Sequence, residues 1–435
     1  MTLPLPTENR RRQRGMMGFP GTPVADPQTA WRTAAAADNG GLRTLYIHIP
    51  FCRRRCLFCP FYFGSTDRAG MAEYVTLLGR ELADAAPALN RYPINAVYFG
   101  GGTPTDLEPE DLAALLTLLH RHYRLANDCE ITVEGRITGF DNDKIQACLD
   151  HGVNRFSLGV QTFDTALRRS LGRAADRNQV IARLQQLAMT NQAAVVIDLL
   201  YGLPGQTPEQ WREDQRLILG EVPVSGLDHY RLRVHHRLPL AQKVAAGQLP
   251  SLPDETACWT MYRDGEELMA AAGAVRLSIK HYALDSRERN LNNDISGRKH
   301  ICLPFGIHAG GRLGDYRFAQ TDDPAEYRRA VTAGRKPLAA AEQLPPDFPV
   351  AAVLAGQISR QRRLNLVPAA ATAAADRHHR ILELGNAVLE QWREKGWLLP
   401  ERHGWSGLTS RGMFMHPQLG TELMEKVAQA WEKES

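Results

Sequence analysis

Three cysteines lie within one short segment, Cys52-Arg-Arg-Arg-Cys56-Leu-Phe-Cys59, which directly follows an apolar run ending Ile47-His-Ile-Pro50. Three thiolates at this spacing can bind three corners of a [4Fe–4S] cubane from a single loop, whereas such clusters commonly take four cysteines. The fourth iron would then be open to the amino and carboxylate groups of a substrate. A zinc site with His48 as its fourth ligand, or unconnected buried thiols, are the alternatives.

Glycines and polar residues also follow the later apolar runs. Phe99-Gly-Gly-Gly-Thr-Pro104 follows the second run, and its glycines would let a ligand approach free backbone N–H and C=O groups. Glu134 and Gln161 lie at the ends of later runs, Arg173 lies on the loop after Gln161, and Asp198 lies in the next run. Asp198 lies inside an apolar run, where a carboxylate is costly unless paired. Either Arg173 forms an internal ion pair with it, or Arg173 binds a ligand carboxylate in a forked geometry.

Alternating strands and helices are predicted to position these residues. Short apolar runs occur at residues 42–49, 96–99, 130–134, 155–160, 194–200 and 228–234. Amphipathic helical stretches separate them at residues 71–89, 109–123, 142–151, 178–189 and 208–219. This alternation indicates parallel βα units, and therefore an α/β fold. We expect a partial (β/α)6 barrel, with a doubly wound sheet as the alternative; either places the polar residues at the carboxyl ends of the strands.

The pattern changes beyond the last predicted strand. We divide the chain into an N-terminal arm (1–41), the barrel (42–240), a barrel extension that covers the substrate (241–345) and a mainly helical, winged-helix-like C-terminal domain (346–435). Helices are expected at residues 254–272 and 324–333, with a glycine-rich segment at 306–314. In the last domain, residues 397–398 and 405–408 could form a hairpin before a final helix at 421–431.

Composition restricts the class of protein. The chain has 435 residues, 23% of them charged, and a net charge of +4, which is too small to indicate a nucleic-acid partner. The basic run Asn9-Arg-Arg-Arg-Gln-Arg14 is local, and we expect it to be a solvated arm. No apolar run approaches 18 residues, so no membrane span is expected. Seven cysteines, an odd number, favour a reducing compartment and a cytoplasmic location.

The segment Tyr46-Ile-His-Ile-Pro-Phe-Cys-Arg-Arg-Arg-Cys-Leu-Phe-Cys59 resembles the radical S-adenosylmethionine (SAM) superfamily, in the branch of oxygen-independent coproporphyrinogen III dehydrogenase. The resemblance implies a [4Fe–4S] cluster on Cys52, Cys56 and Cys59. It also implies reductive cleavage of SAM to a 5′-deoxyadenosyl radical, and two bound molecules of SAM. Residues matching those that face the cluster-bound SAM are Tyr46, Gly101 and Glu134. Residues matching those that face the second SAM are Phe58, Gly102, Thr103, Gln161, Arg173 and Asp198.

Two differences from the motifs of related families narrow the choice of family within this branch. The dehydrogenases carry a further cysteine where this chain has Phe61, and the related haem chaperones carry a His-Asn-x-x-Tyr-Trp signature that is missing here. Residues 228–240, 278–282, 289–291, 304–306 and 309–313 instead resemble the haem-utilising class C radical SAM methyltransferases, the anaerobilin synthases. This implies methylation of a haem meso carbon, ring opening to a linear tetrapyrrole and iron release without oxygen. Coproporphyrinogen dehydrogenation and haem trafficking remain the alternatives.

A haem substrate would need an apolar slot with cations for its propionates. Candidate cations in these segments are Arg231, Arg233, Arg237, Lys280, Arg289 and Arg312, which could equally form a solvated basic face. Candidate iron ligands are His235, His236, His281 and His308. An electron donor, either flavodoxin-like or an NAD(P)H-dependent reductase, is the expected protein partner.

Overall fold

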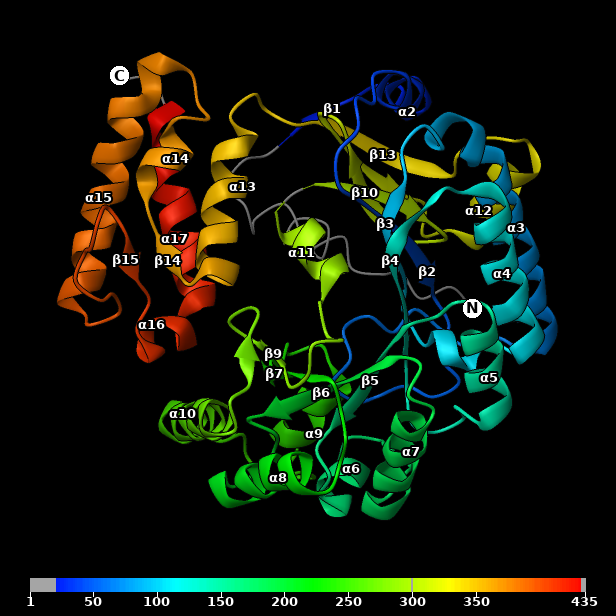
Figure 1. The fold of residues 1–435 in the computed structure, drawn as a ribbon, viewed down its shortest axis with the longest axis horizontal. Helices are drawn as coiled ribbons and strands as arrows, with labels where there is room; N and C mark the ends of the chain where they lie inside the picture. Colours follow the sequence, from blue (N-terminus) through cyan, green and yellow to red (C-terminus); the bar gives the residue numbers. More distant parts are fainter. Residues whose placement is uncertain (1–20, 299, 432–435) are drawn as a thin grey trace.

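A computed structural model describes residues 21–298 and 300–431. One sheet of thirteen strands passes through the molecule, and helices cover it (Figure 1). Its centre consists of six parallel strands: β2 (Arg43–Ile49), β3 (Ile94–Gly101), β4 (Leu125–Gly135), β5 (Arg155–Gln161), β6 (Ala194–Tyr201) and β7 (Gly226–Arg231). These strands stand side by side in sequence order, as in a (β/α) barrel, whereas a doubly wound sheet reverses its order. The predicted α/β fold is therefore confirmed, and among the described residues the two outermost strands, β1 and β8, do not pair to close the sheet.

Helices follow the strands as the sequence pattern predicts. They are α3 (Arg68–Leu89), α4 (Pro109–His122), α5 (Asn142–Asp150), α7 (Arg177–Met189) and α8 (Pro208–Gly220). Side chains cap most of their first turns; for example, Asp176 and Gln179 form a capping box at the start of α7. The short helix α6 (Thr165–Ser170) was not predicted. It lies between β5 and α7, and the chain turns from its end into Arg173.

The sheet extends beyond the six strands on both sides. At the β2 edge, β10 (Ile301–Phe305) pairs in parallel with β2. The antiparallel strands beyond it are β11 (Gly310–Leu313), β12 (Tyr316–Gln320), β13 (Leu338–Gln343) and β1 (Thr22–Pro23). At the other edge, β9 (His281–Ala283) and β8 (Val275–Arg276) follow β7. None of these seven outer strands was predicted, since each is short and several contain charged or small residues.

Part of the expected N-terminal arm is ordered structure. Helix α2 (Pro27–Ala36) begins after Asp26, whose side chain accepts a hydrogen bond from the N–H of Gln28. The buried Trp31 packs edge-on against Phe318 of β12, with ring centroids 5.1 Å apart. Residues 27–36 of the arm therefore pack on the sheet, whereas the solvated arm was expected for the basic run alone. The basic run at residues 9–14 lies outside the described residues.

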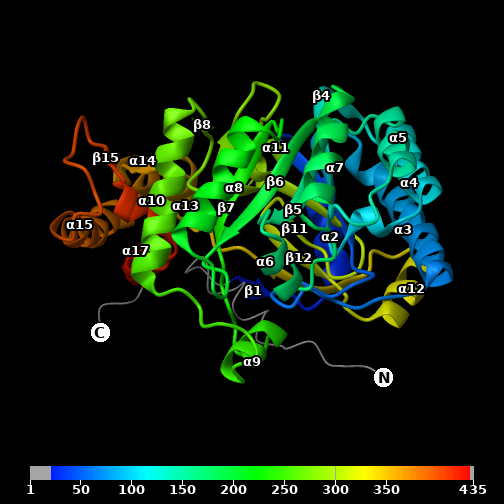
Figure 2. The same cartoon turned by 90° about the horizontal axis from the view of Figure 1, so that it is seen from below.

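The remaining helices follow β7 in the chain, and the last five of them stand together at one side of the molecule (Figures 1 and 2). They are α9 (Pro239–Ala245), α10 (Glu255–Ala271), α11 (Leu291–Gly297), α12 (Pro324–Thr332), α13 (Phe348–Gly356), α14 (Leu366–Ala370), α15 (His378–Glu394), α16 (Ser410–Phe414) and α17 (His416–Ala428). A two-stranded sheet joins β14 (Arg363–Leu364) to β15 (Ser406–Gly407). The predicted hairpin is present as antiparallel bridges between Leu398 and Leu408 and between Arg402 and Trp405. In the described parts of the chain, no helix has the length and apolar character of a membrane span.

Candidate functional site

The three cysteines lie in the loop between β2 and α3. Cys52 and Cys56 are buried and Cys59 is half-buried, and all three are free thiols. The N–H of Cys52 donates to the carbonyl of Gly64 (3.0 Å), and the N–H of Leu57 donates to the carbonyl of Leu171 (3.2 Å). These bonds fold the loop onto itself and attach it to the segment after β5, so the thiols are held at the carboxyl end of the barrel.

The donor set of this loop fits an iron–sulfur cluster. Thiolates are the soft ligands that such clusters take. Within the described residues, no three His, Cys, Asp or Glu side chains converge as the ligands of one metal ion would. Cysteines on a cubane bind three different irons, so their sulfurs need not converge. In the alternative zinc site His48 would be the fourth ligand, but its Nδ1 atom is 2.9 Å from the hydroxyl of Tyr46.

A carboxylate that the sequence did not single out holds the cysteine loop. Asp106 ends the short 3-10 helix η1 (Pro104–Asp106), and its Oδ2 accepts the backbone N–H of Arg53 at 2.7 Å. The same oxygen pairs with Nη2 of Arg136 at 2.8 Å, while Nη1 of Arg136 donates to the carbonyl of Arg54 at 2.8 Å. Asp106 and Arg136 therefore fix the backbone between the first two cysteines.

The glycine run after β3 packs against the cysteine loop. The N–H groups of Gly101, Gly102 and Thr103 donate to Glu134 Oε2 (3.2 Å), Ile49 O (2.7 Å) and Phe51 O (3.0 Å). The expectation that these glycines offer free N–H groups is therefore wrong. A Cβ on Gly102 would lie 2.5 Å from the carbonyl oxygen of Phe51, so glycine is required for this close packing. The hydroxyl of Thr103 donates to Cys52 Sγ at 3.2 Å.

Tyr46, Gly101 and Glu134 come together around Tyr98. Tyr98 donates a short hydrogen bond to Glu134 Oε1, and the rings of Tyr98 and Tyr46 stack with centroids 6.3 Å apart. Burial raises the pKa of Glu134, and burial followed by the charge of His308 lowers the pKa of His48 to about 3. Tyr46, Gly101 and Glu134, which were predicted to contact the cluster-bound SAM, therefore lie together on the neighbouring strands β2, β3 and β4.

Phe58, Gln161, Arg173 and Asp198 form a second group around Gly159. A Cβ on Gly159 would lie 3.0 Å from Arg173 Nη2 and 3.1 Å from Gln161 Oε1, and Gly159 pairs with Asp198 across β5 and β6. The Arg173 guanidinium lies 5.7 Å from the ring centroid of Phe58.

Within the part of the chain that the structure describes, two polar atoms of this second group have no hydrogen-bond partner. Gln161 Oε1 and Arg173 Nε are buried without a hydrogen bond, and Gln161 adopts a left-handed backbone with φ of 71°. No ion pair joins Arg173 to Asp198 among the described residues, so the alternative of an internal ion pair is not realised. Burial lowers the pKa of Arg173, whereas burial and the Asp228 carboxylate raise the pKa of Asp198 to about 8. A buried, unpaired guanidinium fits an anionic ligand such as a carboxylate.

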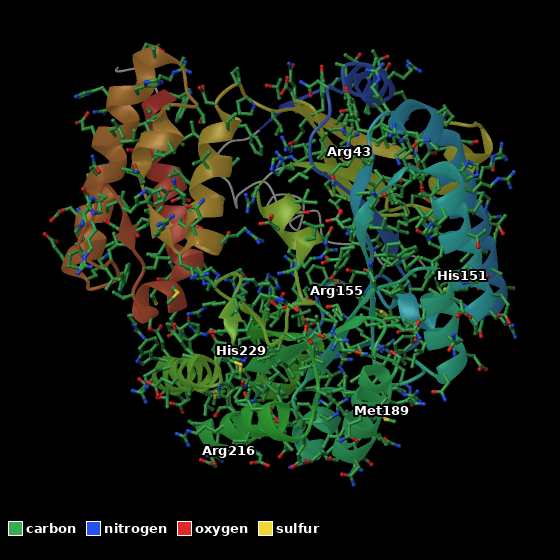
Figure 3. The ribbon with its side chains drawn as sticks, in the orientation of Figure 1. Arg43, His151, Arg155, Met189, Arg216 and His229 are labelled. Atoms are coloured by element: carbon green, nitrogen blue, oxygen red, sulfur yellow. The ribbon has the colours of Figure 1, made fainter. Side chains whose placement is uncertain are left out.

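A network of buried charged side chains adjoins this second group; its members are Asp228, His281, Glu288 and Arg155. His281 Nδ1 is 2.8 Å from Asp228 Oδ2, and His281 Nε2 is 2.9 Å from Glu288 Oε1. Glu288 in turn pairs with Arg155, which Figure 3 labels near the centre of the molecule, at 2.9 and 3.1 Å. Burial opposes charge on His281, but the two carboxylates raise its pKa to about 9. Asp228, a carboxylate within an apolar strand, is the sequence feature that could have indicated this network. Nothing in the local sequence indicated Arg155 or Glu288.

A cavity of about 640 Å³ opens beside the cysteine loop. Phe58, Cys59 and Phe61 form one wall, and Phe61 is 69% exposed, which is unusual for an aromatic side chain. The β7 end and the C-terminal segment supply the other walls. Residues of these walls include Leu200, Tyr201, Tyr230, Leu232, Tyr262, Ile279, Met413, Phe414, Met415 and His416.

Three of the six predicted cations line this cavity, namely Arg231, Arg233 and Lys280. No carboxylate of the described residues forms an ion pair with them; Arg231 lies 4.9 Å from the Phe414 ring centroid and Lys280 lies 5.1 Å from that of Tyr230. The other three do not line it: Arg289 pairs with Asp128 at 3.2 Å, and Arg312 lies 5.5 Å from the Phe348 ring centroid. Arg237 lies on the chain between β7 and α9.

The four predicted iron-ligand histidines do not line the cavity either. The rings of His235 and His236 lie 4.1 Å apart, and His281 uses both ring nitrogens in the network of buried charges. His308 is exposed on a left-handed backbone, with φ of 67°. The histidines that do line the cavity are His229 and His416, which the sequence did not single out.

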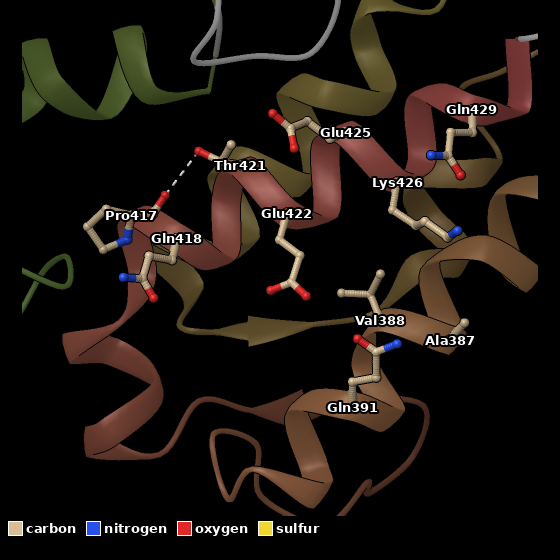
Figure 4. A pocket seen from close by; sticks show the side chains of 10 residues that line it. All are labelled: Ala387, Val388, Gln391, Pro417, Gln418, Thr421, Glu422, Glu425, Lys426 and Gln429. Carbon is tan, nitrogen blue, oxygen red and sulfur yellow. Dashed lines mark hydrogen bonds between the residues drawn. The ribbon is translucent and has the colours of Figure 1, made fainter.

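Another hollow, of about 630 Å³, lies between α15 and α17 (Figure 4). Its walls carry mixed polar side chains, including Gln391, Glu422, Glu425 and Lys426, and contain no residue of the cysteine loop. Thr421 donates to the carbonyl of Pro417 at 3.2 Å along its edge. Because it contains none of the chemistry-bearing groups, we place the site at the cavity beside Cys59.

Comparison with known proteins agrees with this geometry. The profile described as the Radical SAM superfamily matches residues 46–218. The chain is 39% identical over 332 residues to anaerobilin synthase of Escherichia coli O157:H7, covering 75% of this chain and 74% of that protein. It is 33% identical over 281 residues to the heme chaperone HemW of Synechocystis sp., covering 63% and 67%. Its fold resembles that of coproporphyrinogen III oxidase from Escherichia coli, with a TM-score of 0.78, 20% identity and coverage of 95% and 97%.

The sequence similarity and the cysteine loop lead to the same assignment. The solved structure, at its low identity, shows the shared fold alone, while the relative at 39% identity extends over three quarters of the chain. The predicted resemblance is thus confirmed. The chain belongs to the radical SAM superfamily and is a radical SAM enzyme that uses a [4Fe–4S] cluster and SAM.

Proposed function

We propose that this enzyme degrades haem without oxygen. It methylates a porphyrin meso carbon, opens the ring to a linear tetrapyrrole and releases the iron. The observation that carries this proposal is the cavity in which Phe58 and Cys59 face a set of cations without carboxylate partners. The similarity to anaerobilin synthase supports the same substrate.

The cavity suits haem in size and chemistry. Its volume of about 640 Å³ falls within the usual range of ligand pockets. Aromatic and aliphatic side chains such as Leu200, Tyr230 and Phe414 offer apolar contact to a planar ring. Arg231, Arg233 and Lys280 offer charge to two propionates, because clustered cations that form no ion pair with a described carboxylate are stabilised by an anionic ligand.

The two residue groups are assigned to two molecules of SAM. Cys52, Cys56 and Cys59 hold the cluster, which when bound supplies the electron for reductive cleavage of SAM. Tyr46, Gly101 and Glu134 would orient the SAM at the cluster. The second SAM, the methyl donor, would lie against Phe58, Gln161, Arg173 and Asp198, with Gly102 and Thr103 shaping the loop beside it. Arg173 would bind its carboxylate, and Asp198, largely protonated near neutral pH, could donate as well as accept hydrogen bonds.

The rest of the chain would exclude solvent and receive partners. Residues 413–418 already line the cavity, which supports a covering role for the segments at 241–345 and 346–435. Reduction would come from a flavodoxin-like protein or an NAD(P)H-dependent reductase. We place the reaction in the cytoplasm, where free thiols persist.

The test is an anaerobic incubation of reconstituted protein with haem, a reductant and SAM labelled on its methyl group. We expect label in an opened tetrapyrrole together with released iron. Label remaining in SAM would contradict the proposal. Vinyl products from coproporphyrinogen would instead indicate the dehydrogenase, and stoichiometric haem binding without SAM turnover would indicate a chaperone.

A further inference from the structure

His416 combines three features at the cavity. It is the first residue of α17, and it lines the same cavity as Phe58 and Cys59 of the cysteine loop. Its Nδ1 atom lies 2.9 Å from the backbone carbonyl of Met413. A carbonyl can only accept, so Nδ1 carries the proton and the lone pair of the neutral ring lies on Nε2. A backbone carbonyl on the other ring nitrogen is the arrangement that orients histidines as metal ligands.

The surroundings keep this ring neutral. Burial, and then the charge of Lys280, lower the pKa of His416 to about 3, while the bond to Met413 opposes the shift only partly. The groups acting on it from packed elements are Lys280, Arg233 and Arg276, all cationic. A neutral imidazole is the form that binds iron.

The other histidine of the cavity wall is engaged elsewhere. His229 Nε2 lies 2.9 Å from Gln215 Oε1, and its ring packs at 4.9 Å from that of Trp211. A Cβ on Gly265 of α10 would lie 3.1 Å from His229 Cε1, so the ring is enclosed by the helices outside the sheet.

The corner that carries His416 is anchored to the barrel. Arg411 of α16 pairs with Glu255 of α10 at 2.8 Å, and Phe414 packs on Trp259 with centroids 5.4 Å apart. A ligand on this corner is therefore held over the cavity by packing and an ion pair with α10, as a preorganised metal ligand requires.

We infer that His416 Nε2 is the protein ligand of the haem iron in this cavity. The inference rests on the proposed function, and it deepens that function by assigning the iron contact. The nitrogen lone pair forms the bond to iron, and no proton or electron is transferred in the step. The propionates then extend toward Arg233 and Lys280.

Binding of two porphyrins to the full-length, anaerobically reconstituted protein tests this assignment. Iron protoporphyrin IX can accept a ligand, whereas metal-free protoporphyrin IX has the same ring and propionates but no iron. For His416→Ala, we expect haem affinity to fall by about tenfold or more, with a shifted Soret band and an altered haem electron paramagnetic resonance signal. Affinity for metal-free protoporphyrin IX should stay unchanged. His416→Gln, which retains a hydrogen-bond donor toward Met413, should behave like His416→Ala.

The control is His379→Ala, an exposed histidine in the first turn of α15, which should bind both porphyrins as the unmodified protein does. Equal weakening of both porphyrins in the His416 variants would overturn the inference, since it would indicate a propionate or packing role. An unchanged haem spectrum would also overturn it while leaving the proposed function standing. If the unmodified protein bound neither porphyrin, the proposed function itself would fail.

Discussion

The imidazole of His281 on β9 lies 2.8 Å from the carboxylate of Asp228 on β7, and its other nitrogen lies 2.9 Å from Glu288. Asp228 is also the cross-strand neighbour of Asp198. Burial and the Asp228 carboxylate together raise the pKa of Asp198 to about 8. The buried charges thus extend from the proposed SAM contact on β6 across β7 to β9, and return through Glu288 to Arg155 on β5. This arrangement makes the stability of the fold depend on pH.

Stability should fall as the solution becomes alkaline. The pKa of His281 is raised from 6.5 to about 9, so its contribution is fully present below pH 6.5 and is lost as pH rises through 9. The shift corresponds to roughly 3 kcal/mol of unfolding free energy. Urea unfolding at pH 6.5 and pH 9.5 should show this difference, and His281→Gln should largely abolish it. The exposed variant His379→Gln should retain it; an equal pH dependence in His281→Gln would refute the assignment.

Glu288, at the other end of this network of buried charges, sets the acid limit of the stability of the fold. Hydrogen bonds from His281 and the charge of Arg155 outweigh burial and lower the pKa of Glu288 from 4.5 to about 2. Its contribution is therefore present above pH 4.5 and is lost as pH falls toward 2. Arg155→Met would leave Glu288 without its guanidinium partner and should cost about 3–5 kcal/mol of unfolding free energy. Arg183→Met, at an exposed bond to Asn142, should cost well under 1 kcal/mol in the same urea titration.

Asp106 should control how firmly the cluster is held. Its carboxylate fixes the N–H of Arg53 and the guanidinium of Arg136, so Asp106→Ala would loosen the loop without removing a thiol. We expect cluster affinity to fall about tenfold, seen as lower iron content and faster bleaching of cluster absorbance by a chelator. Glu108→Ala removes only the partly exposed ion pair with Arg53 and serves as the control. Equal cluster retention by Asp106→Ala would show that the clamp is dispensable.

Variants in the two groups of SAM-binding residues should affect different reaction products. Arg173→Met removes the guanidinium proposed for the methyl-donor SAM, so methyl transfer should fall by about 10–100-fold while 5′-deoxyadenosine still forms. Arg173→Lys should recover only part of this, because an ammonium lacks the planar fork. Glu134→Gln should instead reduce 5′-deoxyadenosine formation itself. Parallel loss of both products in all three variants would contradict two separate SAM contacts.

Neutralising the cavity cations should weaken tetrapyrrole binding through the propionates. The double variant Arg233→Gln with Lys280→Gln should lose about tenfold or more in affinity for haem and for metal-free protoporphyrin IX alike. The dimethyl ester of protoporphyrin IX, which lacks both carboxylates, should bind the variant and the unmodified protein equally. Arg289→Gln, whose side chain pairs with Asp128 away from the cavity, is the control.

The cluster loop, the six parallel strands and the grouping of residues at their carboxyl ends could all be predicted from the sequence. This information is local: the cysteine spacing fits within one loop, and hydrophobic periodicity specifies each strand or helix and its buried face. Arg173 and Asp198 could be placed near each other because successive parallel strands end at the same edge of the sheet.

The distant segments that complete the site could be identified only from the folded structure. β10 pairs with β2 across more than two hundred residues, Glu288 bonds both His281 and Arg155, and the corner carrying His416 lines the same cavity as Phe58. Each depends on the summed packing of many side chains over long sequence separations, which no short pattern records. For the same reason, the glycine N–H groups that the sequence suggested as ligand contacts bind the folded chain itself.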